Sequence, residues 1–272
     1  YEPENWAIAV NNENFRKAIF HGLDRATATS ARFPGDDPQL HLINTITPRG
    51  FATNDGKDFV TYGALAEFNS TESFNAELAL QYKEAAVAEL TEAGCKFPII
   101  IDIVSLSWSG QNFLRETRRA GNYAIQVLNW GADYMDPETW TDPFADENSY
   151  NFMYDTTEYN GINQNTKTEE TKAINDEYFR LVEEAKAEVN DMDKRFELFA
   201  AAEAYYIEHA VVIPLYVSGG SYQATKLNGF EGQFAAMGQS TSRYKGQHVY
   251  KTAMTQDQFD EQYEAWKAAM GE

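Results

Sequence analysis

Residues 122–140, NYAIQVLNWGADYMDPETW, join an apolar segment to an acidic turn surrounded by aromatic side chains. The apolar part, residues 122–130, predicts a strand that ends at Trp130. Ligands of α/β proteins collect at the carboxyl ends of strands. Because the carboxylate of Asp133 follows this strand directly, residues 130–140 are the first candidate for a binding site.

Helix and strand patterns alternate along the rest of the chain, which indicates an α/β fold. Apolar residues recur at helical spacing in the segments 11–25, 75–94, 174–189, 196–207 and 259–270, and a further helix is expected at 111–120, before Gly121. Short apolar runs predict strands at 6–10, 97–104, 122–130 and 210–218, and those at 97–104 and 210–218 are expected to be buried. Residues 33–63 are rich in proline and glycine, so we expect a long irregular excursion on the surface.

The composition is that of a globular protein, with 43% hydrophobic and 14% aromatic residues in a chain of 272. Acidic residues number 42 and basic residues 22, which gives a net charge of −20. Nucleic acids and anionic membranes are bound through clustered lysine and arginine, so this balance argues against both partners. It gives a weak bias toward cationic ligands.

The single cysteine, Cys95, excludes an internal disulfide and a cysteine-based zinc cluster. It follows a helix end and precedes an apolar run, so we expect a buried, inert thiol. The histidines are scattered without the spacing of a zinc-binding pair, so we expect no metal and no other cofactor. No apolar stretch reaches the length of a membrane span.

The acidic turn allows three interpretations from residue types alone. Asp133 and Asp136 could form the carboxylate pair of a glycosidase. However, an Asp-Pro step more often marks a turn cap, and the chain lacks nucleophile and phosphate-binding motifs. The second interpretation is a structural loop. The third is ligand binding, because a partly dried carboxylate with aromatic walls suits an ammonium group.

Two other polar segments are weaker candidates. Residues 142–151, DPFADENSYN, offer oxygen ligands without the spacing or the glycine of an EF-hand loop, which favours a solvated acidic loop. Arg115, Arg118 and Arg119 form a basic group on one predicted helix. Such a group usually pairs with nearby acids and less often binds a ligand carboxylate.

Four stretches resemble the peptide- and oligopeptide-binding proteins of ABC importers, which are family 5 of the extracellular solute-binding proteins. FRKAIFHGLDR (15–25) resembles the helix that opens their third domain, and WGADYMDP (130–137) resembles their Trp-x-x-Asp-Tyr-x-x-Pro segment. DKRFELFAAAEAYYIEHAVVIPLY (193–216) resembles their late helix and strand. LINTITPRGFATNDGKDF (42–59) is most similar to the cell-surface oligopeptide-binding lipoproteins of streptococci.

This resemblance implies an α/β lobe of the periplasmic-binding-protein type (type II, peptide-binding class), with a mixed sheet flanked by helices. It implies a two-lobed receptor that closes on an extended oligopeptide, contacts mainly its backbone and works with the permease subunits of an ABC importer. In the family the aspartate of the Ala-Asp-Tyr segment pairs with the peptide's α-ammonium group, and that position is Asp133 here. Trp130, Ala132 and Tyr134 flank it, and Arg118 is a further candidate for contact with the ligand.

The resemblance is to the C-terminal part of longer proteins, which carry a lipid-anchored N-terminus on the extracellular face of the cell membrane. We therefore expect residues 1–218 to form their third domain, a C-terminal lobe. Residues 219–272 are expected to return to the first lobe and end in a helix. The family also has another helix and strand after the segment that matches 97–104, so we expect residues 105–110 to be an irregular join.

We therefore expect part of a non-enzymatic, monomeric receptor without a cofactor. A carboxylate-pair hydrolase and a surface adhesion module are the alternatives. The receptor needs Asp133 alone, with Asp136 capping the turn made by Pro137, whereas the hydrolase needs both carboxylates. The adhesion module needs neither of them.

Overall fold

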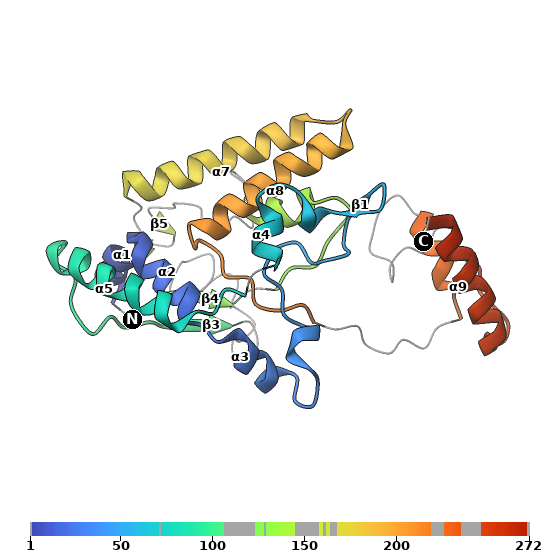
Figure 1. The fold of residues 1–272 in the computed structure, drawn as a ribbon, viewed down its shortest axis with the longest axis horizontal. Helices are drawn as coiled ribbons and strands as arrows, with labels where there is room; N and C mark the ends of the chain where they lie inside the picture. Colours follow the sequence, from blue (N-terminus) through green and yellow to red (C-terminus); the bar gives the residue numbers. More distant parts are fainter. Residues whose placement is uncertain are drawn as a thin grey trace.

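The computed structural model describes residues 2–70, 72–105, 123–127, 129–144, 158–159, 162–163, 168–218, 226–234 and 246–270. Within these residues most elements are helices, and the strands are short (Figure 1). The combination agrees with the predicted α/β class. The predicted helix at 111–120, which holds Arg118, and residues 106–110 of the predicted join lie outside the described residues.

Predicted helices form where capping residues and apolar spacing agree. The side chains of Asn12 and Asn75 accept hydrogen bonds from the backbone N–H groups of Phe15 and Leu78, as N-caps do. Gly94 follows α5 with a φ of +79°, a conformation that a side chain disfavours. The α-helices are α1 (Pro3–Asn11), α2 (Glu13–Gly22), α3 (Arg25–Arg32), α4 (Leu65–Ser70), α5 (Ala76–Glu92), α6 (Glu138–Thr141), α7 (Glu169–Ala187), α8 (Met192–Glu208) and α9 (Gln256–Met270). The 3-10 helices are η1 (Pro38–Leu40), η2 (Phe59–Thr61), η5 (Asp142–Phe144) and η6 (Gly229–Phe234).

The described strands lie in three separate pairs. Two pairs are antiparallel, β1 (Thr53–Asn54) with β2 (Lys57–Asp58) and β5 (Glu158–Tyr159) with β6 (Ile162–Asn163). The third pair is parallel and joins β3 (Ile103–Ser105) to β4 (Ile125–Val127), with Ile103 opposite Ile125. β4 lies inside the predicted strand 122–130 and leads along the chain toward the acidic turn.

Residues 6–10 belong to α1, so the strand predicted there was wrong. Pro3 stands in the first turn, where its missing N–H costs no hydrogen bond, and Glu4 lies near the positive end of the helix dipole. Trp6 and Ala9, three residues apart, are both buried. A short apolar run fits either period, and here the residues before it favour the helix.

The predicted buried strand at 97–104 is also corrected. Only its last residues pair, as part of β3. Phe97, Ile100 and Ile103 are 47%, 43% and 50% exposed, so the apolar run is not a buried strand. Apolar content alone did not distinguish a covered strand from an uncovered one.

Residues 210–218 make one antiparallel bridge, between Leu42 and Tyr216, and form no continuous strand. The backbone carbonyl of Pro214 accepts a hydrogen bond from Arg25 Nη1 at 2.8 Å. An arginine side chain, only 1% exposed, thus supplies a partner that a neighbouring strand would otherwise provide. The predicted strand fails because its backbone partners come from side chains and a loop.

The excursion at 33–63 is irregular, as predicted, but it is not confined to the surface. Phe59, Val60 and Tyr62 are at most 1% exposed and belong to the main core. Asp55 and Gly56, both with positive φ, turn the β1–β2 hairpin between them. The excursion therefore contributes side chains to the main core.

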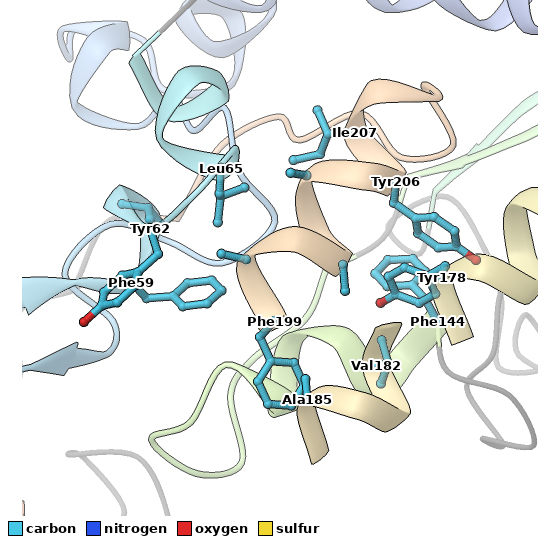
Figure 2. Close-up of a cluster of buried hydrophobic side chains, with 14 of the residues drawn as sticks. Phe59, Tyr62, Leu65, Phe144, Tyr178, Val182, Ala185, Phe199, Tyr206 and Ile207 are labelled. Carbon is cyan, nitrogen blue, oxygen red and sulfur yellow. The ribbon is translucent and has the colours of Figure 1, made fainter. Parts of the chain in front are cut away.

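The main core surrounds α8, as Figure 2 shows. Tyr178 of α7 stacks on Tyr206 of α8 with ring centroids 3.6 Å apart, and Phe144 meets Tyr206 edge-on at 6.1 Å. On another side of α8, Phe196 packs edge-on against Phe59 at 5.6 Å. Because Phe144 lies in η5, four residues after the acidic turn, this core fixes the chain just beyond the candidate site.

A smaller core lies between α1 and α5 and contains Ala9, Ala86, Leu90 and Cys95. Cys95 is 8% exposed, and its burial raises the pKa of the thiol above the ordinary value. A thiol held in its neutral form is a poor nucleophile. The predicted buried position of Cys95 is confirmed.

The Glu203 carboxyl group is fully buried in α8 without a cation among the interactions described for it. It accepts hydrogen bonds from the backbone N–H groups of Ile46 and Thr47 and from the Thr47 hydroxyl, at 2.6, 3.0 and 2.7 Å. Burial raises its pKa from 4.5 to about 7, although these hydrogen bonds pull the pKa down.

This pKa predicts that stability falls as pH rises from about 4.5 to about 7. The folded protein binds the Glu203 proton more tightly than the unfolded chain, so stabilisation is full below this window and lost above it. The loss is about 3 kcal/mol at most. Urea unfolding from pH 4.5 to 8 should show the fall in the natural protein, and Glu203→Gln should lack this component. Parallel pH curves for the two proteins would contradict the prediction.

α9 begins with the predicted capping box: Thr255 N–H donates to Gln258 Oε1, and Gln258 N–H donates to Thr255 Oγ1. The ring centroid of Phe230 in η6 lies 5.1 Å from that of Phe259 and 5.9 Å from that of Tyr263, both on α9. Figure 1 draws this pair of helices apart from the helices of residues 3–208. The division into 1–218 and 219–272 stays a prediction. No helix in the described ranges combines the length and apolarity needed to cross a membrane.

Candidate ligand-binding site

The acidic turn leads into the short helix α6. Asp136 Oδ1 accepts a hydrogen bond from the backbone N–H of Glu138 at 2.9 Å, and the Asp136 carbonyl accepts one from Thr139 N–H at 3.2 Å. Pro137 stands between them with a helical φ of −54°. An aspartate that bonds the N–H two residues later is a turn-forming aspartate. The capping role predicted for Asp136 is confirmed.

Thr139 of α6 receives hydrogen bonds from two residues earlier in the turn. Its hydroxyl oxygen accepts a hydrogen bond from the backbone N–H of Asp133 at 3.0 Å. Its carbonyl accepts one from the indole Nε1–H of Trp130 at 2.7 Å. Thr139 itself is 1% exposed. One buried residue therefore receives hydrogen bonds from two of the residues predicted to contact a ligand.

The structure brings four of the five predicted site residues together on this turn. Asp133 is exposed, Trp130 and Tyr134 are half-buried, and Ala132 is buried at 6% exposure. Among the described residues, no hydrogen bond or ion pair is recorded for the Asp133 carboxylate. The fifth, Arg118, lies outside the described residues.

Tyr134 points its hydroxyl at Asp142, with 3.4 Å between the oxygens. Its pKa is raised above the ordinary value by burial and by the charges of Asp142, Glu138 and Asp136. The phenol therefore stays neutral and can donate a hydrogen bond. Its hydroxyl is used within the protein, which leaves the ring as the part suited to contact a ligand.

The other three carboxylates of the turn are paired with cations. Arg195 donates to Asp136 through Nε at 3.0 Å and through Nη2 at 2.9 Å, and Nη2 also donates to Glu138. Lys186 Nζ lies 3.1 Å from Asp142 Oδ1. The two-point geometry at Asp136 is the strong form of an arginine–carboxylate pair. In the described part of the chain, Asp133 is thus the acid of this turn that keeps its charge available.

Arg195 was missed by the reasoning from sequence. It is 9% exposed, and its Nη1 donates to the carbonyls of Ala185 and Glu188 at the end of α7, both at 3.1 Å. A signal was available, because Arg195 stands four residues before Phe199 on the apolar side of its helix. A buried arginine needs carboxylate or carbonyl partners.

The turn is also attached to the core through uncharged groups. The Tyr178 hydroxyl donates to the Thr141 carbonyl at 3.1 Å, and Trp140 packs edge-on against Phe51 with centroids 5.5 Å apart. α6 is therefore held from α7, from α8 and from the excursion at 33–63. The exposed residues that precede α6, which include Asp133, are therefore attached to a helix whose position is fixed.

This arrangement suits binding better than acid–base catalysis. Asp136, the second carboxylate of the hypothetical hydrolase pair, is held by two hydrogen bonds from Arg195 and by the turn. Both oxygens of this carboxylate are already engaged within the protein, so Asp136 is poorly placed to exchange a proton with a ligand. Among the described residues no group of three or more histidine, cysteine or carboxylate side chains is arranged to hold a metal ion.

Comparison with known proteins gives consistent relatives, although no protein-family model matches the chain. The chain is 26% identical to oligopeptide-binding protein AliB of Streptococcus pneumoniae over 317 aligned positions, which cover 97% of this chain and 48% of AliB. It is 26% identical to oligopeptide-binding protein SarA of Streptococcus gordonii, with 97% and 47% covered. For oligopeptide-binding protein OppA of Bacillus subtilis the identity is 25%, with 79% and 39% covered.

The chain spans about half the length of the curated relatives it matches. The alignment with AliB has 317 positions, whereas this chain has 272 residues. AliB therefore carries residues inside the matched region that this chain lacks. Such a difference is expected near residues 105–110, and residues 106–110 lie outside the described residues.

A solved structure supports the fold independently. A crystal structure described as a peptide-binding protein of a peptide ABC transporter matches with a TM-score of 0.53 and 23% identity. The match covers 78% of this chain and 93% of the solved one. The resemblance and the fold class predicted from the sequence are confirmed. This chain has the fold of a peptide-binding protein of ABC transporters. Over 97% of its length it is similar to streptococcal oligopeptide-binding proteins, and the match covers about half the length of each of them.

Proposed function

We propose that this chain is the ligand-binding lobe of a receptor that captures oligopeptides for an ABC importer. Asp133 holds the peptide's α-ammonium group, and Trp130, Ala132 and Tyr134 form the wall around it. The receptor works on the extracellular face of the membrane, held there by a lipid anchor, and delivers its peptides to the permease subunits. The names and matched lengths of the relatives support this proposal.

One observation about charge carries the assignment of Asp133. Of the acidic side chains in residues 133–142, Asp136 and Glu138 are paired with Arg195, and Asp142 is paired with Lys186. Asp133 is exposed, and within the described ranges no cation is recorded beside its carboxylate. An incoming ammonium group would therefore meet one unneutralised carboxylate, at a place fixed by Thr139.

The surroundings of Asp133 favour a primary ammonium over a metal ion. A hard cation such as Ca²⁺ takes six to eight oxygen ligands, and the neighbouring carboxylates are already engaged by arginine and lysine. An ammonium group needs only about three acceptors and gains from aromatic faces nearby. Half-buried Trp130 and Tyr134 can supply such faces.

The natural protein that carries this sequence should bind free-amine peptides and release them intact. Titration calorimetry with one pentapeptide and its N-acetylated form should give clearly weaker binding for the acetylated peptide, because acetylation removes the positive charge. Mass spectrometry after long incubation should recover the peptide uncleaved. Equal affinities for the two peptides would contradict the ammonium site, and cleavage lost in Asp136→Ala would favour the hydrolase instead.

A further inference from the structure

We propose that Thr139 is a positioning residue that fixes the direction of the Asp133 carboxylate. This inference rests on the proposed function, in which Asp133 holds a ligand ammonium group. It adds a residue that does not contact the ligand, since Thr139 is 1% exposed beneath the turn. The carboxylate acts on the ligand, and the threonine hydroxyl holds the backbone that carries it.

The geometry singles out the hydroxyl of Thr139. The backbone N–H of Asp133 donates to Thr139 Oγ1 at 3.0 Å across a separation of six residues. Residues 129–132 are in neither a helix nor a strand, so no regular backbone ladder holds the approach to Asp133. With no recorded partner among the described residues for its carboxylate, Asp133 depends on its backbone for orientation.

Thr139 can hold the turn because Thr139 is itself held. The residues on both sides of it, Glu138 and Trp140, contact Arg195 and Phe51. The Thr139 carbonyl accepts a hydrogen bond from the indole N–H of Trp130 at 2.7 Å, so the same residue also holds the start of the turn. The Thr139 hydroxyl therefore fixes the backbone of Asp133 relative to the core.

The test compares three single variants of the natural protein with a free-amine pentapeptide and its N-acetylated form. Thr139→Val keeps the shape but lacks the hydroxyl, whereas Thr139→Ser keeps the hydroxyl. Thr141→Val is the matched control, because Thr141 is also 1% exposed in α6 and its hydroxyl donates only to the Glu138 carbonyl among the interactions described for it. Circular dichroism checks that each variant is folded, and Thr139→Ala repeats the test if valine prevents folding.

Thr139→Val should reduce the preference for the free-amine peptide about three- to tenfold, the range for one neutral hydrogen bond. Thr139→Ser and Thr141→Val should leave it within about twofold of the natural protein. In an Asp133→Asn background, Thr139→Val should reduce the preference no further, because the carboxylate it positions is gone.

The outcomes separate this inference from the proposed function. If Asp133→Asn removes the preference but Thr139→Val leaves it unchanged, only the positioning role fails. The same holds if Thr139→Val weakens both peptides equally, which is the result of a merely structural role. If Asp133→Asn itself leaves the preference unchanged, the ammonium site fails, and the positioning role fails with it.

Discussion

Asp133→Asn is expected to lose most of its affinity for free-amine peptides while the protein keeps its fold. In a closed receptor the peptide ammonium is largely desolvated, so removal of its carboxylate leaves an unpaired charge. Truncating one member of such a pair costs about 2–5 kcal/mol. This corresponds to a loss of roughly thirtyfold to several thousandfold in affinity. The fold should survive because the carboxylate has no recorded partner among the described residues.

Asp176→Asn is the matched control for this prediction. Asp176 is exposed on α7, and its substitution makes the same change in side chain and net charge away from the turn. Its affinity for free-amine peptides should equal that of the natural protein. If both variants lose the same affinity, net charge governs binding and Asp133 has no specific role.

Arg195→Met is expected to be the most destabilising of the single changes considered. It would leave the Asp136 and Glu138 carboxylates without their cation, and it would remove hydrogen bonds to the carbonyls that end α7. Removing one partner of a buried ion pair costs about 3–5 kcal/mol. The lower end, about 3 kcal/mol, applies because Asp136 and Glu138 are 21% and 27% exposed and partly screened by solvent.

Arg180→Met provides a close control for Arg195→Met. Arg180 also pairs with two carboxylates, Glu177 and Glu184, but its side chain is 56% exposed on α7. Exposed pairs are screened by water and contribute little to stability. Urea unfolding should therefore show a large loss for Arg195→Met and a minor one for Arg180→Met. Losses of similar size would mean that the Arg195 contacts do not anchor the turn.

The helices were predictable because local signals and burial agree. α5 has Asn75 as N-cap and Gly94 after its end, and α9 has a reciprocal capping box. Residues 6–10 were mistaken because an apolar run of five fits both periods. The runs at 97–104 and 210–218 failed for another reason. Whether an apolar run becomes a buried strand depends on distant neighbours, and a local pattern carries no information about them.

The candidate site was predictable in its exposed part and not in its support. Asp133, Trp130 and Tyr134 were identified because residue types and chain order suggest a carboxylate with aromatic walls after a strand. Arg195 was missed because it meets Asp136 across 59 residues of sequence. Thr139 was missed because a threonine inside an acidic turn has no distinctive sequence signal. The place of Arg195 on the apolar side of α8 signals its burial, but tertiary packing decides which partners such a side chain meets.

The most direct test of the central claim is a double cycle that combines Asp133→Asn with N-acetylation of the peptide. Calorimetry would measure four affinities: those of the natural protein and of the variant, each for the free-amine peptide and for the acetylated peptide. If Asp133 holds the ammonium group, acetylation weakens binding strongly in the natural protein and much less in the variant. The coupling free energy should then reach about 2 kcal/mol or more. Additive effects, with no coupling energy, would show that the Asp133 carboxylate does not hold the peptide's ammonium group.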